Sequence, residues 1–211
     1  MSDGWRERYA SWRLRRKLRR TPRYSLAELP EDTVARVGGH VRILGDNVLT
    51  APLSGRPCVY YSVTIRARAH FMVAAETFQE YLATSQDQVS FLLEDGAHHA
   101  VIDPTNARIS CERDHRSTSK AAFDATPAQR ELLERHNLMH QDWWNTASLE
   151  YLEGILAVDE PILVLGGGTR EPDPGGMSVA GYREAARTRY RFASTKRFPL
   201  MISDDRKAQT Q

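Results

Sequence analysis

Residues 58–69, CVYYSVTIRARA, alternate between two kinds of side chain and set the class of fold. Apolar side chains lie at every second position, and the positions between them are mostly polar. This period of two is typical of a half-buried β-strand, whose successive side chains point to opposite faces. The apolar set is Val59, Tyr61, Val63, Ile65 and Ala67, and the other set is Tyr60, Ser62, Thr64, Arg66 and Arg68.

Segments on either side of this strand also have the pattern of strands. They are 33–44, with a predicted bulge at Gly38-Gly39, 107–114, 189–194 and 198–204. The run ILVL (162–165) is continuous and apolar, which indicates a strand buried on both faces.

Two hairpins and a loop are expected between these strands. The first hairpin covers 88–104 and turns at Asp95-Gly96, and the second covers 149–168 and turns at the sequence DEP (159–161). Residues 169–188 are polar and rich in Gly and Pro, which predicts a loop.

Two helices are predicted beside the strands. Residues 126–139 begin with Thr126, a good N-cap, and Pro127, which suits the first helical position. The predicted fold is therefore mostly β (α+β), an antiparallel, partly barrel-like or sandwich-like sheet with one inserted helix and an N-terminal basic helix. The predicted parts are a basic amphipathic helix over 1–23, a β domain over 24–205 and a flexible tail over 206–211.

Composition is that of a soluble globular protein, with 41% hydrophobic and 27% charged residues among 211. No apolar stretch approaches the roughly 20 residues that cross a bilayer. The first residues are too basic and too interrupted for a signal peptide. Two cysteines build no disulfide framework. We therefore expect a cytoplasmic protein, with a peripheral position at the inner face of the membrane as an option.

Charge is divided unevenly along the chain. Residues 1–23 hold nine basic and two acidic residues, a net of +7, whereas 24–211 hold 20 basic and 25 acidic residues, a net of −5. On a helix, the aromatic residues of this basic segment fall on one stripe with arginines beside it, and Ala10, Leu14 and Leu18 fall opposite. The aromatic stripe and its neighbours are Trp5, Tyr9, Trp12, Arg8, Arg16 and Arg19. This surface is the candidate site for a membrane or a partner; the alternative is a helix that docks on the body.

Four stretches together resemble a known domain. They are LTAPLSGRPCVYYSVTIR (49–66), FLLEDGAHHAVIDP (91–104), LEYLEGILAVDEPILVLGG (149–167) and FPLMISDD (198–205). Over about residues 25–205 the chain resembles the GIDE or beside-a-membrane domain, known from a mitochondrial outer-membrane ubiquitin ligase and also found in bacterial proteins. The motif residues, expected to be structural, are Pro52, Ser54, Gly55, Pro57, Cys58, Tyr60, Tyr61, Gly154 and Gly166.

This resemblance implies a mostly β domain that serves binding or regulation at membranes and has no catalytic residue. Relatives usually carry transmembrane helices, which this sequence does not predict. The ligase also carries a RING, which needs about eight Cys and His ligands. Two cysteines cannot supply them, so ubiquitin-ligase activity is not carried over.

Cys58 could be a nucleophile, a metal ligand or a small residue packed under a turn. Pro52, Gly55 and Pro57 fix a turn before it, and no helix N-terminus follows to lower its pKa. Packing is therefore predicted. Its side chain is expected on the face opposite Val59 and Tyr61.

Other candidate chemistry is weaker. His136 and His140 have a spacing that can chelate a metal on a helix, but no third ligand follows, so no metal is expected. Ser203-Asp204 lacks a partner histidine for a triad. Trp143-Trp144 is either packed or partly exposed as a binding surface. No catalytic residue and no cofactor are predicted.

The sequence thus predicts a non-catalytic binding or regulatory module that acts at a membrane surface through its basic N-terminal helix. The expected partner is an anionic membrane surface or a protein. One alternative is a nucleic-acid-binding accessory protein, which the acidic body disfavours. The other is an enzyme with an unrecognised site.

Overall fold

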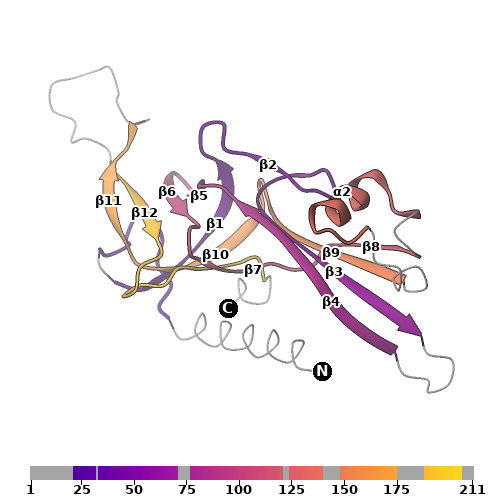
Figure 1. The fold of residues 1–211 in the computed structure, drawn as a ribbon. Helices are drawn as coiled ribbons and strands as arrows, with labels where there is room; N and C mark the ends of the chain where they lie inside the picture. The colour runs from indigo at the N-terminus through magenta and orange to yellow at the C-terminus, as the bar shows by residue number, and fades with distance from the viewer. Residues whose placement is uncertain are drawn as a thin grey trace. The chain divides into compact units, whose positions relative to one another are not determined.

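The computed structural model describes residues 21–31, 33–70, 77–120, 124–139, 148–174 and 188–205 (Figure 1). The prediction of a mostly β fold is confirmed, because strands dominate and the described residues contain one α-helix. Residues 1–20 and 206–211 lie outside this description, and so do His140 and Trp143-Trp144. The predictions made for them stay predictions.

The described chain forms two compact units, each built from separated segments. Unit 1 takes the described residues of 1–48, 89–111 and 158–211. Unit 2 takes those of 49–88 and 112–157. No helix in the described part of the chain is long and apolar enough to cross a membrane.

Unit 1 is one eight-stranded sheet in the order β11-β12-β6-β5-β1-β10-β13-β7. Most pairs are antiparallel, as predicted, but β12 runs parallel to β6 and β13 runs parallel to β7. The strands are β1 (Ala35–Ile43), β5 (Phe91–Asp95), β6 (His98–Asp103), β7 (Arg108–Ser110), β10 (Pro161–Gly166), β11 (Gly168–Pro172), β12 (Thr188–Ala193) and β13 (Met201–Ser203). The loop predicted over 169–188 is therefore wrong for its first residues, since β11 pairs with β12.

The centre of this sheet is as apolar as predicted. Residues 162–165 of β10 are all buried. The predicted Gly38-Gly39 bulge is wrong, because β1 pairs with β10 in unbroken register from Ala35 to His40. Gly39 is needed for another reason: an added Cβ would lie 2.4 Å from the backbone oxygen of Glu94. The two glycines allow close approach of neighbouring groups instead.

Unit 2 is a second sheet with a helix beside it. Strand β3 (Pro57–His70) pairs with β9 (Ser148–Ala157) on one side and with β4 (Thr77–Gln88) and β2 (Leu49–Thr50) on the other. Strand β8 (His115–Ser119) completes the sheet next to β9. The predicted strand 58–69 is confirmed as β3, whereas β4 and β8 were not predicted.

Helix α2 (Pro127–Arg135) confirms the inserted helix and its predicted start. Thr126 caps it, and the Thr126 and Gln129 side chains bond each other's backbone N–H groups. Gln129 also donates to Ser117 of β8 (2.9 Å), which α2 accompanies in Figure 1. Leu132 and Leu133 enter the core of unit 2. The helix ends at Arg135 rather than 139, because Asn137 adopts a φ of 55°.

The hairpin predicted over 149–168 is wrong. Strand β9 pairs with β3 and β8 in unit 2, and β10 pairs with β1 and β13 in unit 1. The residues between them are bonded to β1: Val41 donates to the Glu160 oxygen and accepts from Asp159 N, both at 2.9 Å. The first hairpin is confirmed as β5 and β6, with Gly96 at a φ of 61° in its turn.

Candidate functional site

The turn before β3 is held by a carboxylate that the sequence analysis missed. Glu153 of β9 is fully buried and accepts hydrogen bonds from Leu53 N (2.8 Å) and Ser54 N (3.1 Å). Gly55, at a φ of 67°, closes the turn by donating to Ala51 O. The only sequence signal for this role is an acidic residue inside an apolar strand pattern, since a carboxylate buried there needs donors.

Cys58 is packed in the core of unit 2, as predicted, but on the other face. It shares its hydrophobic cluster with Tyr61. Where β3 pairs with β9, Cys58 lies opposite Ala157 and Tyr60 lies opposite Leu156, so Val59 between them is an extra residue without a partner on β9. That bulge reverses the alternation. Burial raises the pKa of the Cys58 thiol to about 11, and the charge of Glu153 adds to the rise. The thiol is therefore protonated near neutral pH and is a poor nucleophile.

The remaining motif residues are divided between the two units. Pro52 and Ser54 belong to the turn, Pro57 begins β3, and Tyr60 is buried in β3. Gly154 lies opposite Ser62 in the same sheet. Gly166 ends β10 in unit 1, where an added Cβ would lie 2.8 Å from Leu200 Cδ1. None of these residues lines the pocket of unit 1 described below. The six N-terminal candidates, from Trp5 to Arg19, lie outside the described residues.

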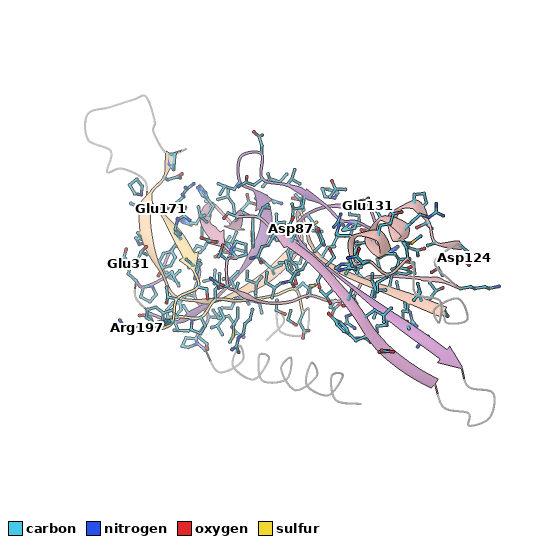
Figure 2. The ribbon with its side chains drawn as sticks, viewed as in Figure 1. Glu31, Asp87, Asp124, Glu131, Glu171 and Arg197 are labelled. Atoms are coloured by element: carbon cyan, nitrogen blue, oxygen red, sulfur yellow. The ribbon has the colours of Figure 1, made fainter. Side chains whose placement is uncertain are left out.

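Several charged side chains elsewhere in the described part of the chain form ion pairs. Glu171 of β11 (Figure 2) accepts from Arg189 and Arg191, each at 2.7 Å. His99 lies 3.0 Å from Asp173. Within the described ranges, no three His, Cys, Asp or Glu side chains are grouped in a way that could hold a metal ion.

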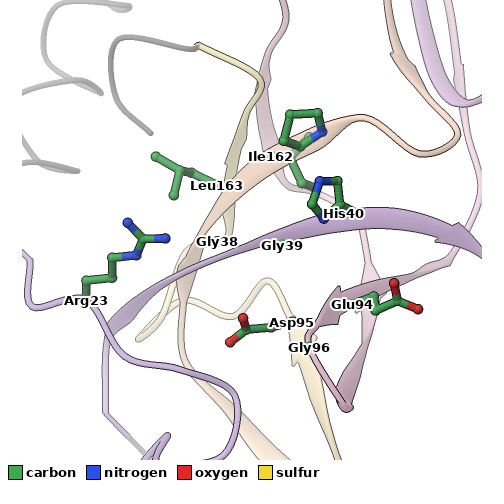
Figure 3. Close-up of a pocket in the computed structure, with 10 residues that line it drawn as sticks. Arg23, Gly38, Gly39, His40, Glu94, Asp95, Gly96, Ile162 and Leu163 are labelled. Carbon is green, nitrogen blue, oxygen red and sulfur yellow. The ribbon is translucent and has the colours of Figure 1, made fainter. Parts of the chain in front are cut away.

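A pocket of about 240 Å³ lies on the sheet of unit 1 (Figure 3). Its walls come from the segment before β1, from β1, from the β5–β6 turn and from the start of β10. The residues that line it are Arg23, Gly38, Gly39, His40, Glu94, Asp95, Gly96, Pro161, Ile162 and Leu163. Figure 3 shows the Arg23 side chain near Gly38 and Leu163, with His40 farther along β1 and Glu94 on the neighbouring strand β5.

The pocket exists because β1 has two adjacent residues without side chains. A Cβ on Gly38 would lie 3.2 Å from Arg23 Nη2 and 3.3 Å from Leu163 Cδ2. Both are ends of flexible side chains, so a small substituent there would take up pocket volume without striking backbone. Gly39 has no such freedom, because Glu94 backbone lies against it.

The two carboxylates of the pocket already have donors. Glu94 accepts from Arg42 Nη2 (2.7 Å) and Nε (3.1 Å), and these bonds hold the pKa of Glu94 below its usual value. Arg42 also pairs with Asp159. Asp95 Oδ2 accepts from the backbone N–H of Leu26 at 3.0 Å. One oxygen of each carboxylate, Glu94 Oε1 and Asp95 Oδ2, therefore already accepts hydrogen bonds from the protein.

The basic side of the pocket lacks such partners. Arg23 forms a parallel bridge with Arg36 of β1, and neither guanidinium has an ion pair within the described part of the chain. Arg36 is 6% exposed, and its Nε has no hydrogen-bond partner. Burial lowers the pKa of Arg36, and the nearby charge of Arg23 lowers it further. The sequence analysis did not single out either arginine. They are neighbours because of an isolated backbone bridge between residues 23 and 36, and no pattern in the sequence around either residue predicts that bridge.

Comparisons of the chain with protein-family models, with curated proteins and with solved structures found no match. The resemblance to the GIDE domain therefore stays a prediction.

Proposed function

We propose that this protein is a non-catalytic binding module and that the pocket of unit 1 holds its ligand. The observation that supports this is the chemistry of the pocket wall. Its described lining contains no Ser, Thr, Cys, Lys or Tyr nucleophile, and its titratable side chains are Arg23, His40, Glu94 and Asp95. Glu94 is engaged with Arg42, and a carboxyl of lowered pKa is a weak general base at neutral pH. What the wall offers is a concave surface with apolar side chains and a few polar groups, as ligand sites do.

A pocket-filling variant tests this proposal. The Cβ that Gly38→Val adds has the flexible ends of Arg23 and Leu163 as its nearest neighbours, so we expect the sheet to stay intact. We expect a mixture of small acidic, basic and neutral compounds, followed by ligand-observed NMR, to contain compounds that bind the wild-type chain and not this variant. Ile43→Val, on the exposed end of the same strand, is the matched control and should bind like the wild type. Equal binding by Gly38→Val and the wild type would contradict the proposal.

A second candidate function rests on the charge of residues 1–23. Their net charge of +7 and the residues Trp5, Tyr9 and Trp12 suit a peripheral position on an anionic membrane surface, where basic residues each contribute about 1 kcal/mol. The full chain should float with vesicles rich in anionic lipid and not with neutral ones. Changing Trp5 and Trp12 to Ala should reduce flotation, because stable attachment needs apolar insertion as well as charge. Binding to DNA or RNA instead, with a steep salt dependence, would favour the nucleic-acid alternative.

A further inference from the structure

We propose that the pocket of unit 1 is selective for an anionic group, a phosphate or a carboxylate on a small molecule or headgroup, and that Arg23, which lines the pocket, binds it, with the neighbouring Arg36 adding its positive charge. This rests on the proposed function and names the chemistry of its ligand. The inference follows from which charged groups at the pocket have partners and which do not.

The charged groups of the pocket wall differ in whether they have partners. Glu94 and Asp95 each have a donor supplied by the protein, at 2.7 Å and 3.0 Å. Arg23 has no carboxylate partner among the described residues. A ligand that supplied acceptors would complete the hydrogen bonding of the arginine side. A ligand that supplied donors would compete with bonds that already exist.

Arg36 is buried beside Arg23. Alternation along β1 places the Arg36 and Gly38 side-chain positions on the same face, and Arg23 Nη2 lies over Gly38. Arg36 does not itself line the pocket, but it is bridged to Arg23 through the backbone and feels the charge of Arg23. Arg36 is more than nine-tenths buried, and its Nε has lost water contacts without gaining an acceptor.

A bound anion would change the surroundings of these two arginines. Two adjacent cations repel each other, and the low pKa of Arg36 reflects both its burial and the charge of Arg23. A phosphate or carboxylate has several acceptor oxygens, and the planar guanidinium fork matches them in pairs. Binding of an anion to Arg23 would relieve the repulsion between the two arginines.

The size of the pocket limits the ligand. A volume of about 240 Å³ is below the usual range for drug-sized molecules, roughly 300–1,000 Å³. It suits a small acid, a phosphate monoester or the headgroup of a lipid. The same chemistry therefore has a soluble source and a membrane source, which the experiment must separate.

The experiment measures anion binding by the full chain. Inorganic phosphate, acetate and glycerol 3-phosphate are titrated against the wild type, with the thermal midpoint and NMR shifts as readouts. We expect saturable binding that raises the midpoint, because a ligand of the folded state stabilises it. Arg23→Gln should weaken binding about tenfold to a hundredfold, the loss of one charge-assisted contact. Arg56→Gln, a surface arginine of unit 2 paired with Asp114, should leave it unchanged.

Gly38→Val separates the pocket from the basic N-terminal segment. This variant keeps every charge, so anion binding that it abolishes belongs to the pocket, and anion binding that it leaves intact would overturn the inference. Arg36→Met serves as a second variant and should also weaken binding. Binding that is unaffected by Arg23→Gln would likewise overturn it.

Vesicles distinguish the two sources of the anion. If anionic vesicles bind with a dependence on Arg23 and the soluble anions do not, the ligand is a lipid headgroup and the inference holds. If none of these anions binds, while neutral or basic compounds bind the wild type and not Gly38→Val, the anion inference fails and the proposed binding function stands. If Gly38→Val alters the binding of no compound of any class, the proposed function fails with it.

Discussion

Unit 2 buries the carboxylates of Glu150 and Glu153, and unit 1 buries Arg36 as well as Asp204 and Asp205; the surroundings of Arg36 differ from those of the two glutamates. In unit 2, Glu150 lies between Arg68 and Arg116, and Glu153 accepts from two backbone N–H groups. In unit 1, Arg36 has Arg23 beside it and no acceptor at its Nε. A buried charge whose partners are all present is part of the architecture, because removing it leaves those partners unsatisfied. A buried charge without a partner costs stability until something binds, so unit 1 is where the molecule has capacity left for a ligand.

The largest expected effect is in unit 2. Glu153→Ala leaves the N–H groups of Leu53 and Ser54 without their acceptor, at about 1–3 kcal/mol each. We expect the free energy of unfolding in urea to fall by about 2–5 kcal/mol, while phosphate still stabilises the protein. Glu131→Ala, on α2 with an exposed side chain (Figure 2), is the control and should change stability by less than about 0.5 kcal/mol. A loss below about 1 kcal/mol for Glu153→Ala would remove the contrast between the units.

The second effect should have the opposite sign. Arg36→Met removes a buried charge that lacks an acceptor and replaces it with an apolar chain of similar length. In phosphate-free buffer we expect the free energy of unfolding to stay unchanged or to rise by up to about 2 kcal/mol. Arg36→Lys keeps the charge and should give no such rise. If Arg36→Met instead lowers stability by about 2 kcal/mol, Arg36 is as structural as Glu153.

The smallest effect concerns the thiol of unit 2. Cys58→Ala should cost about 1 kcal/mol, a core contact of roughly one small group. Native Cys58 should resist thiol reagents at pH 8, since its pKa of about 11 keeps it protonated. This pKa is raised above the usual 9.0, so its contribution to stability is fully present below about pH 9 and is lost as pH rises toward 11. Unfolding free energies of the wild type and Cys58→Ala should therefore converge over that range; rapid labelling of the native thiol would contradict its burial.

Local pattern was enough to predict the elements whose own residues determine them. Strand β3 follows from its alternation, residues 162–165 from a continuous apolar run, and the start of α2 from Thr126 and Pro127. Strand β4 escaped prediction because its sequence, TFQEYLATSQDQ, is mostly polar and its buried positions include the small Ala83 and Ser85. It is a strand because β3 pairs with it.

Contacts between distant residues explain the rest. Glu153 accepts a hydrogen bond from Leu53, 100 residues earlier in the chain. No spacing of residues in the sequence predicts that contact. The bulge at Val59 appears only once β9 is paired with β3, and it decides which face Cys58 occupies. The pocket likewise depends on a bridge between Arg23 and Arg36 and on the β5–β6 turn reaching Gly39. Sequence analysis found the glycines and interpreted them as a bulge.

The route of the chain through the two units bears on how the protein is made. Strand β1 lies between β5 and β10, yet β10 follows every strand of unit 2 along the sequence. On a ribosome, which releases the chain from its N-terminus, unit 2 is complete before β1 can acquire its second neighbour. Until residues 161–166 emerge, β1 carries a row of unpaired backbone groups that can join other nascent strands. Slow translation between 157 and 161 would lengthen that exposure. We therefore expect codon choice or chaperone binding at this point to change the yield of folded protein and not its stability.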